Sequence, residues 1–400
     1  MENVLQQYSA HSSNPKWNDI IARADELYRQ DGDMRSPFLR DYTRIIHCSA
    51  YRRLRNKTQV FFSPQSDHIC TRIEHVNHVE SISYTIAKYL GLNTELTRAI
   101  SVAHDLGHPP FGHKGEKFLS KISSQHIGED FWHEKNGLWA VDCIELLEDY
   151  NKCRRNLDLT YAVRDGIISH CGEVSEDGIR PRDEAIDLNL FQYPSQYAPF
   201  TFEACVVKIA DKISYIGRDM EDAMHLGILE TGAIEELQND LSEVLGEKIN
   251  NTVLINRFIS NICENSNPER GIAMSRELKE AMDVMNAFNL KNIYRCERVE
   301  YSDKFFELVL DQIFSLLAGA YNGWNTFTEL KKIARFYPVM IERFTEWLLV
   351  YTDMKNIDIN KNRIVFDITN ERDYKKAVIT YMSGMTDKFA IETYNEIISF

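Results

Sequence analysis

Residues 104–116 read HDLGHPPFGHKGE, and this stretch joins the end of one predicted helix to the start of another. Before it, apolar residues recur three or four positions apart between 96 and 103 and predict a helix with a buried face. That helix has to end near Gly107, because prolines follow at 109 and 110 and proline does not continue a helix. The adjacent pair His104 and Asp105 is therefore expected at the C-terminal end of an apolar helix.

Helical periodicity extends outward from this stretch in both directions. After His75, apolar residues three or four apart predict a helix that ends at Gly91. Further helical patterns fall at 138–150, 160–170, 200–226, 233–263, 275–287 and over most of 301–350.

Two segments depart from this periodicity. Residues 174–200 hold three prolines and show little periodicity, which predicts a long surface insertion. Near the C-terminus, apolar residues alternate around Asn360-Lys361-Asn362 and predict a short β-hairpin; they are Ile357, Ile359, Ile364, Phe366 and Ile368. The predicted fold class is all-α with a minor β element.

Composition sets the broad class of the protein. The 400 residues carry 60 acidic side chains against 46 lysines and arginines, a formal net charge of −14. With 44% hydrophobic and 26% charged residues, the chain is globular rather than collagen-like, coiled-coil or wholly disordered. No apolar run approaches the roughly 18 residues of a membrane span, and the N-terminus lacks the pattern of a secretory signal. The eight cysteines are scattered without a Cys-X-X-Cys pair, which favours free thiols and a cytoplasmic location.

Basic residues are concentrated in one segment of this acidic protein. Residues 35–72 carry eight lysines and arginines against Asp41 and Asp67, a local excess of six positive charges. This excess suggests that an anionic ligand binds there. The alternative is a solvated helix face, and the charges alone do not decide between the two.

Histidine is also unevenly distributed, and eight of the 12 histidines lie between 68 and 133. The sharpest feature is the pair His104-Asp105, because adjacent helical residues point about 100° apart and can approach one ion from two sides. His75 opens the preceding helix, and Asp211 lies on a long apolar helix, where an unpaired carboxylate is costly. Imidazole and carboxylate together suit Mn²⁺, Mg²⁺, Fe²⁺ or Zn²⁺. For Asp211 taken alone, a salt bridge to a basic residue is the alternative.

A stripe of polar residues continues from Asp211 along the same helix. Tyr215 and Asp219 lie four and eight positions further on and share one face with it. Core packing would place apolar side chains there, so we interpret the stripe as the wall of a pocket. The phenol can stack on a sugar or base, and Asp219 can accept a hydrogen bond from a hydroxyl.

The loop after His104-Asp105 holds a second chemical unit. Glu116 is three residues past His113, near a predicted helix start, and can hold one nitrogen of that imidazole while the other faces a substrate. A histidine oriented in this way is suited to general acid–base catalysis. The tripeptide Trp132-His133-Glu134 repeats the pairing of histidine and carboxylate.

The set of His75, His104-Asp105 and Asp211 resembles the metal signature of the HD superfamily of phosphohydrolases. Further stretches resemble its deoxyguanosine-triphosphate triphosphohydrolase branch, in the order of that family and across nearly the whole chain. They are RSPFLRDYTRIIHCSAYRRLRNKTQVF (35–61), TRIEHVNHV (71–79), HDLGHPPFGHKGE (104–116), VKIADKISYIGRD (207–219) and SGMTDKFAIETY (383–394).

The resemblance implies an all-α HD-domain fold with additional C-terminal helices. The chain would form one large helical body over 1–400, with a catalytic core at 68–225 and a C-terminal helical region at 226–400. It would cleave a dNTP, with dGTP as the family's expected substrate, between the 5′-oxygen and the α-phosphorus. The products would be the deoxynucleoside and inorganic triphosphate.

The resemblance also implies roles position by position. His75, His104, Asp105 and Asp211 would bind one divalent ion. Mn²⁺ or Mg²⁺ is expected first, with Fe, Zn, Ni or Co as further options. Active-site proton transfer would involve His113, Glu116 and His133. Phosphate and sugar contacts would come from Gln59, Arg72, Lys212, Tyr215 and Asp219. Residues 293–301 are a candidate segment for contacts to the base.

Partners and rival functions remain open at this stage. The resemblance implies a homo-oligomer that takes a dNTP substrate, and it leaves open an allosteric dNTP or single-stranded DNA. One rival is an HD-type nucleotidase or phosphodiesterase with the same metal set. The basic block and the Tyr215/Asp219 stripe argue against this rival, because they suit a deoxynucleoside triphosphate. The other rival is a nucleotide- or single-stranded-DNA-binding regulator with a vestigial site, and the complete ligand set argues against it.

Overall fold

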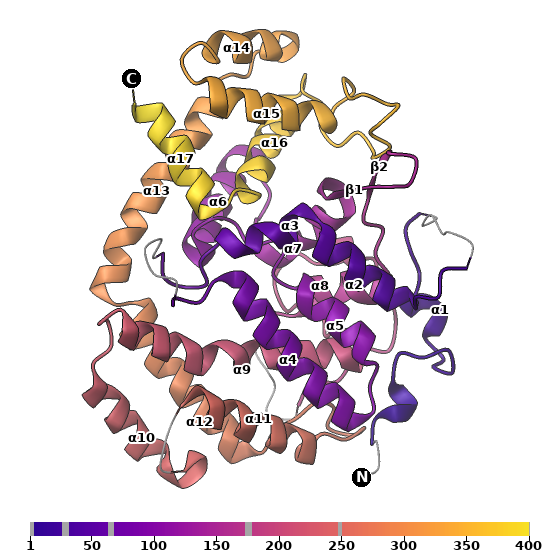
Figure 1. The fold of residues 1–400 in the computed structure, drawn as a ribbon, viewed down its shortest axis with the longest axis vertical. Coiled ribbons are helices and arrows are strands. Elements are labelled where there is room, and N and C mark those ends of the chain that lie inside the picture. The colour runs from indigo at the N-terminus through magenta and orange to yellow at the C-terminus, as the bar shows by residue number, and fades with distance from the viewer. Residues whose placement is uncertain (1–3, 26–31, 63–67, 173–177, 247–249, 400) are drawn as a thin grey trace.

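The computed structural model describes residues 4–25, 32–62, 68–172, 178–246 and 250–399, and within these ranges the chain is mainly helical (Figure 1). The described strands, β1 (Leu146–Glu148) and β2 (Arg154–Asn156), form one antiparallel hairpin with Leu147 opposite Arg155. The all-α class with a small β-hairpin is confirmed. The helices are α1 (Trp17–Ile20), α2 (Pro37–His47), α3 (Ser49–Arg53), α4 (Arg72–Leu90), α5 (Thr94–Ala103), α6 (Gly112–Ile127), α7 (His133–Trp139), α8 (Tyr161–Ser169), α9 (Phe202–His225), α10 (Thr231–Leu245), α11 (Asn251–Asn265), α12 (Arg276–Asn289), α13 (Glu297–Ala318), α14 (Thr326–Ile333), α15 (Pro338–Val350), α16 (Glu371–Ser383) and α17 (Asp387–Ile398).

The hairpin lies elsewhere than the sequence predicts. Residues 357–368 form no strand of their own, and the backbone of this segment instead bonds to the edge of β2: Arg154 N donates to the Ile359 carbonyl (2.7 Å) and Lys361 N to the Arg154 carbonyl (2.9 Å). The hairpin occupies part of 138–150, for which a helix is predicted. That helix ends because the Glu145 side chain accepts hydrogen bonds from Ala50 N and Arg53, which draws the chain toward α3.

Two further predicted segments differ in detail. The pattern at 233–263 is divided into α10 and α11, because Gly246 takes a left-handed φ of 89° and Asn250 caps α11 by accepting from Val253 N. Of the predicted insertion, residues 174–177 lie outside the described ranges. The remainder is irregular but anchored, with Phe191 and Phe200 buried.

The first apolar core surrounds α5, which packs against α2, α4, α8 and α9. Asn93 caps α5 by accepting from Glu95 N and Leu96 N, and Gly91 closes α4 in the left-handed conformation. Most of α5 is buried, including Ile100 and Ala103 with no exposed surface. The C-terminal end of α5 therefore places His104 and Asp105 inside the protein.

The second apolar core is formed by α6, α13 and the helices α14 to α17. Figure 1 shows α13 running along one side of the molecule, from the level of α9 to that of the C-terminal helices. The two cores do not divide at residue 226, because α6 belongs to the second and α10 to α12 to the first. The domain division at that residue stays a prediction. In the part of the chain described, no helix is long and apolar enough to cross a membrane.

Gly107 controls how the loop after α5 packs against α7. A Cβ atom at this position would lie 2.0 Å from the His133 carbonyl oxygen and 2.2 Å from Gly137 N. We expect Gly107→Ala to lower the free energy of unfolding by roughly 2 kcal/mol or more, as overpacking against backbone does. Gly232→Ala, which meets nothing within 4 Å on α10, should be neutral or stabilise by about 0.5–1 kcal/mol. Urea unfolding of both variants checks this, and equal effects would contradict it.

Candidate active site

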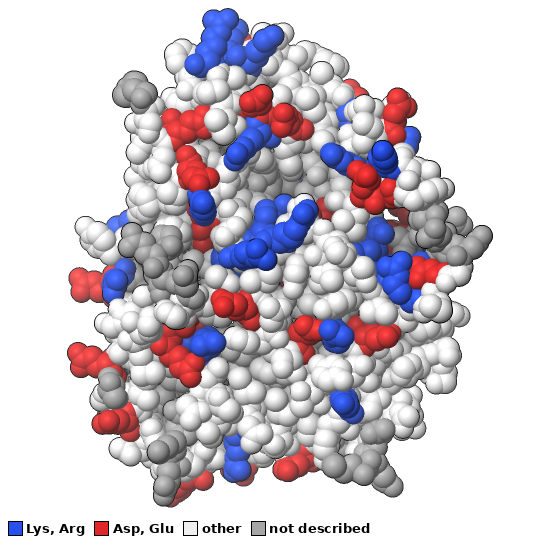
Figure 2. Space-filling model, viewed as in Figure 1, with Lys and Arg blue, Asp and Glu red and all other residues white. Residues whose placement is uncertain are grey.

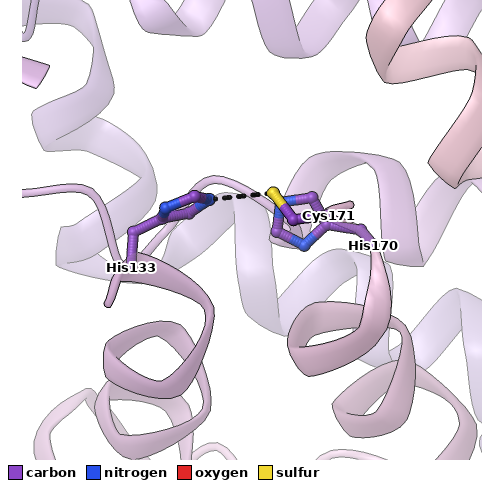
Figure 3. A group of neighbouring side chains, drawn as sticks. All are labelled: His133, His170 and Cys171. Atoms are coloured by element: carbon purple, nitrogen blue, oxygen red, sulfur yellow. Dashed lines mark hydrogen bonds between the residues drawn. The ribbon is translucent and has the colours of Figure 1, made fainter. Parts of the chain in front are cut away.

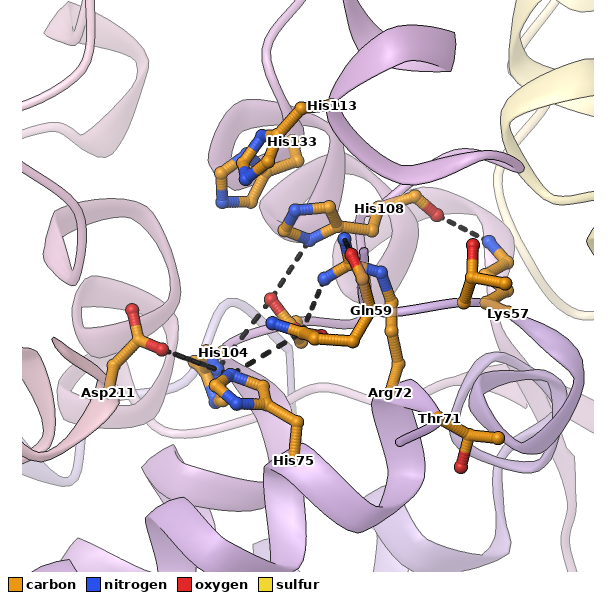
Figure 4. A network of polar contacts seen from close by, with 12 residues as sticks. Lys57, Gln59, Thr71, Arg72, His75, His104, His108, His113, His133 and Asp211 are labelled. Atoms are coloured by element: carbon orange, nitrogen blue, oxygen red, sulfur yellow. Dashed lines mark hydrogen bonds and ion pairs between the residues drawn. The ribbon is translucent and has the colours of Figure 1, made fainter. Parts of the chain in front are cut away.

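Three helices bring the predicted metal ligands together. His75 lies in the first turn of α4, His104 caps the C-terminus of α5 with Asp105 next to it, and Asp211 lies on α9. His75 Nε2 lies 3.0 Å from Asp211 Oδ1, and His104 Nε2 lies 3.8 Å from the same oxygen. Figure 4 shows these imidazoles and Asp211 pointing toward one another. The first three of these residues are almost fully buried.

The hydrogen bonds of the two imidazoles fit a metal ion. The His104 Nδ1–H donates to the Ser101 carbonyl (2.7 Å), and His75 Nδ1 lies 3.1 Å from Ser214 Oγ, which itself donates to the Asp211 carbonyl. In the neutral rings, both Nε2 lone pairs therefore face carboxylate oxygens, and the buried His104 Nε2 has no hydrogen-bond partner among the described residues. Lone pairs and carboxylates that converge repel one another unless a cation lies between them. These nitrogen and oxygen donors suit a divalent ion of the Mn²⁺, Fe²⁺ or Zn²⁺ kind.

The charges around the cluster keep its carboxylates ionised. Burial alone would raise the pKa of Asp211, but when the rings are protonated instead, a hydrogen bond from His75 and the positive charge of His104 hold that pKa well below its usual range. Burial likewise opposes ionisation of Asp105, and His108 and Arg72 outweigh it to lower its pKa. Arg72, itself buried, donates to Asp105 Oδ2 at 2.8 Å, while Oδ1 lies 2.9 Å from His108 Nδ1 and 3.6 Å from His104 Nε2.

Glu116 lies between the two predicted catalytic histidines. Its Oε1 accepts from the His133 backbone N–H (2.7 Å) and lies 3.0 Å from His133 Nδ1, while its Oε2 lies 3.3 Å from His113 Nδ1. The side chain of His113 is 72% exposed and that of His133 is buried. The ring of His108 lies against that of His133, with 3.7 Å between centroids. One carboxylate thus orients an outer and an inner imidazole.

The C-terminal helices hold the loop of this site from behind. Asp387, at the start of α17, is buried and accepts from Phe111 N and from Thr58 N, each at 2.8 Å. The buried Lys57 donates to the His108 carbonyl and to the Ser383 carbonyl. Segments more than 270 residues apart in sequence therefore fix the position of the loop.

A cavity of about 600 Å³ opens beside the metal cluster. It is lined by all five predicted substrate-binding residues, Gln59, Arg72, Lys212, Tyr215 and Asp219. From the candidate segment 293–301, Tyr294, Arg298 and Val299 also reach it. Its volume falls in the range of roughly 300–1,000 Å³ that is typical of small-molecule sites.

The far wall of this cavity contains a buried acid–phenol pair. The Tyr294 hydroxyl donates to Asp219 Oδ2 at 2.5 Å, and Asp219 is 2% exposed. Burial raises the pKa of Asp219 to about 7, although the hydrogen bond from Tyr294 opposes the rise. The carboxyl of Asp219 therefore changes charge near neutral pH.

The basic block at 35–72 does not gather at this cavity. Of its eight cationic side chains, Arg72 alone is among the residues that line the cavity. Arg40 pairs with Asp33, Arg53 pairs with Glu145, and Arg44 donates to the carbonyls of 156 and 157. Figure 2 shows basic side chains over the middle of one face, where Arg52 and Arg53 of α3 line a separate cleft with Arg154, Arg343 and Lys388. The block as a whole therefore does not hold an anion at this cavity, because most of its charges pair elsewhere in the fold.

Several residues of the site are missing from the sequence-based prediction. His170 and Cys171, directly after α8, line the cavity, as do His108 and Phe306. The ring centroid of His170 lies 5.0 Å from that of His104. The signal for His170 was its place at the end of a predicted apolar helix, which is also the place of His104.

Comparison with known proteins agrees with this geometry. The family model of the HD domain matches residues 72–216. The chain is 32% identical to a deoxyguanosinetriphosphate triphosphohydrolase-like protein of Caldanaerobacter subterraneus subsp. tengcongensis, over 98% of this chain and 92% of that protein. It is 31% identical to a protein of the same description from Desulfatibacillum aliphaticivorans, over 91% and 88% of the two chains. A third, from Rickettsia bellii, is 29% identical over 96% and 97%.

The metal cluster predicts a test by thermal unfolding. Mn²⁺ at about 100 times its Kd should stabilise the metal-free protein by about 2.7 kcal/mol, because it binds the folded state alone. His104→Ala removes one ligand and should abolish this gain, whereas His47→Ala, an exposed histidine on α2, should retain it. A shift of equal size in His104→Ala and in the wild type would contradict the assignment.

Asp219 predicts a pH-dependent stability. Its folded pKa of about 7 lies above the roughly 3.9 of an unfolded aspartate, so the folded state binds the extra proton and loses stability as pH rises between these values. Asp219→Asn stays neutral. Its stability relative to the wild type should therefore improve by roughly 2–3 kcal/mol between about pH 5 and pH 8. Urea unfolding measures this, with the exposed Asp240→Asn as the control; a pH-independent difference for Asp219→Asn would disprove it.

Proposed function

The chain belongs to the deoxyguanosinetriphosphate triphosphohydrolase-like family of HD-domain phosphohydrolases, and on that premise we propose that it hydrolyses dNTPs to deoxynucleoside and inorganic triphosphate. The observation that carries the proposal is the junction of the buried His–Asp cluster with the 600 Å³ cavity. Arg72, which contacts Asp105, places a cation beside the cluster, and the phenols of Tyr215 and Tyr294 also line the cavity. Cationic, aromatic and hydroxyl groups are what the phosphate, base and sugar of a nucleotide require.

The phosphate end of the substrate would be held by charge. His75, His104, Asp105 and Asp211 would hold one divalent ion, with Mn²⁺ or Mg²⁺ as the proposed metal, which when bound polarises a phosphoryl oxygen and lowers the pKa of a water molecule. Arg72 and Lys212 line the same part of the cavity and would stabilise the charge that develops on the phosphoryl oxygens. Arg72 also orients Asp105 through its 2.8 Å contact.

Proton transfer is assigned to the imidazoles that Glu116 holds. Glu116 binds the Nδ1 side of both His113 and His133, which leaves the Nε2 of His113 for exchange of a proton, whereas the Nε2 of His133 lies 3.3 Å from Cys171 Sγ. His113, at the exposed mouth of the cavity, would donate the proton to the leaving 5′-oxygen. His133, buried behind it, would support the charge of the reacting groups.

The sugar end of the cavity favours deoxyribose. The buried Gln59 Oε1 has no hydrogen-bond partner among the described residues and lines the cavity with Tyr215 and Asp219. We assign Gln59 and Asp219 to the 3′-hydroxyl and Tyr215 to the face of the sugar. An added 2′-hydroxyl would lie unpaired against Tyr215, and unpaired polar groups discriminate strongly between substrates.

The remaining expectations stay predictions. The family resemblance implies a homo-oligomer, a cytoplasmic location and a role for an allosteric dNTP or single-stranded DNA. Base preference, with dGTP first, belongs to the same group.

Product analysis by ion-exchange chromatography tests the function. Each dNTP, and GTP beside dGTP, would be incubated with the protein and Mn²⁺. Deoxynucleoside with intact triphosphate is the expected pair of products, and GTP should react more slowly than dGTP. Monophosphate with pyrophosphate would assign a different bond cleavage, and equal rates on GTP and dGTP would refute the sugar assignment.

His113→Ala in the same assay tests the proton-transfer step. The loss of a general acid should lower kcat by roughly 10²–10⁴-fold, while the stabilisation by Mn²⁺ stays unchanged. His126→Ala, an exposed histidine on the same helix α6, is the matched control. Near-normal turnover of His113→Ala at every pH would remove His113 from the mechanism.

A further inference from the structure

A second cluster of metal-binding side chains lies beside the HD cluster and contains sulfur. It combines His133 at the start of α7 with His170 and Cys171 directly after α8 (Figure 3). One ring nitrogen from each histidine and the Cys171 sulfur all lie within 4.8 Å of one another. His133 Nε2 and Cys171 Sγ are 3.3 Å apart. These three residues are additional to the His75, His104, Asp105 and Asp211 set, and the two clusters adjoin at His170, which also lies within 4.8 Å of His104 and Asp105.

The hydrogen bonds of the two histidines leave the correct nitrogens for a metal. His133 Nδ1 is bound to Glu116 Oε1 (3.0 Å), and the His170 Nδ1–H donates to the Ile167 carbonyl (2.8 Å). His170 is 2% exposed, and its Nε2 is buried without a hydrogen-bond partner among the described residues. A carboxylate or carbonyl on the far nitrogen is the usual support of a metal-bound histidine.

The donor set favours zinc over the Mn²⁺ or Mg²⁺ proposed for the HD cluster. Tetrahedral zinc with Zn–S of about 2.3 Å and Zn–N of about 2.0 Å places sulfur and nitrogen roughly 3.5 Å apart, close to the 3.3 Å between Cys171 and His133. Thiolate is a soft ligand that Mg²⁺ and Mn²⁺ bind poorly. Three protein ligands would leave a fourth position, and all three residues line the substrate cavity.

We propose that His133, His170 and Cys171 form a second metal site, selective for Zn²⁺, that inhibits the enzyme by withdrawing His133 from the substrate. On binding, the S–H bond of Cys171 breaks, the sulfur–zinc bond forms and the proton leaves to solvent. His133 Nε2 then binds the metal and no longer forms its hydrogen bond with Cys171. The inhibition rests on the proposed function, whereas the binding of zinc does not.

Cobalt spectroscopy tests the binding without reference to activity. Co²⁺ replaces Zn²⁺ and absorbs in the near-ultraviolet by charge transfer only when a thiolate binds it, and the HD cluster holds no sulfur. We expect this band in the wild-type protein, its disappearance on addition of Zn²⁺ and its loss in Cys171→Ser. Cys143→Ser, a half-buried cysteine of a different cavity, should keep the band. A wild type without the band, or a band that survives Cys171→Ser, would overturn the site.

Alkylation of the wild-type protein tests the same site without a variant that could misfold. Zn²⁺ should slow the reaction of Cys171 with iodoacetamide, measured by mass spectrometry, and leave the rate at Cys143 unchanged. Equal rates at Cys171 with and without Zn²⁺ would also overturn the proposal.

Inhibition is measured separately, with each variant compared with its own activity in Mn²⁺. Zn²⁺ should inhibit the wild type and Cys143→Ser at concentrations at least about tenfold lower than those that inhibit Cys171→Ser. Loss of a metal ligand should lower the affinity for Zn²⁺ at least as much as loss of a residue that supports a ligand. Equal sensitivity would refute the inhibitory role even where cobalt shows the site. Absence of any hydrolysis would instead refute the proposed function and leave the cobalt result standing.

Discussion

Buried carboxylates are the constraint on which the rest of this structure depends. Asp105 is buried at the end of α5, a largely buried helix of the first core, and an unpaired charge there would be prohibitively costly. The fold surrounds it with Arg72, His104 and His108. His104 also faces Asp211, which lies 3.0 Å from His75, so two carboxylates and two imidazoles meet at a site suited to a cation.

The second core determines how that charged centre meets the substrate. Asp387 and Lys57 hold the loop that follows α5 through the backbone of Phe111 and His108. This loop begins α6, whose Glu116 orients His113 and His133. The C-terminal helices thus fix the position of the site loop without lining the metal cluster. This is a physical role for the segment 383–394, which resembles the family in sequence.

Sequence patterns predicted the parts of the site that are local. The ends of α4 and α5 and the stripe on α9 follow from apolar periodicity, capping residues and proline, which made His75, His104, Asp105 and Asp211 candidates that the family resemblance joined into one set. The hairpin was misplaced because alternation of apolar residues does not say which backbone a segment pairs with. The basic block was misread for a related reason, because charge counts do not show that Arg53 pairs with Glu145 or Arg40 with Asp33.

The sequence by itself determined the all-α class and the ends of helices such as α4 and α5, because these depend on residues within a few turns of one another. Only the tertiary structure decided that Glu116 lies between two histidines and that Asp219 pairs with Tyr294, 75 residues further along the chain. It also brought Cys171 to His133 across 38 residues. Such contacts depend on how whole helices pack, and helix packing is set by the sum of many apolar contacts that no local pattern records.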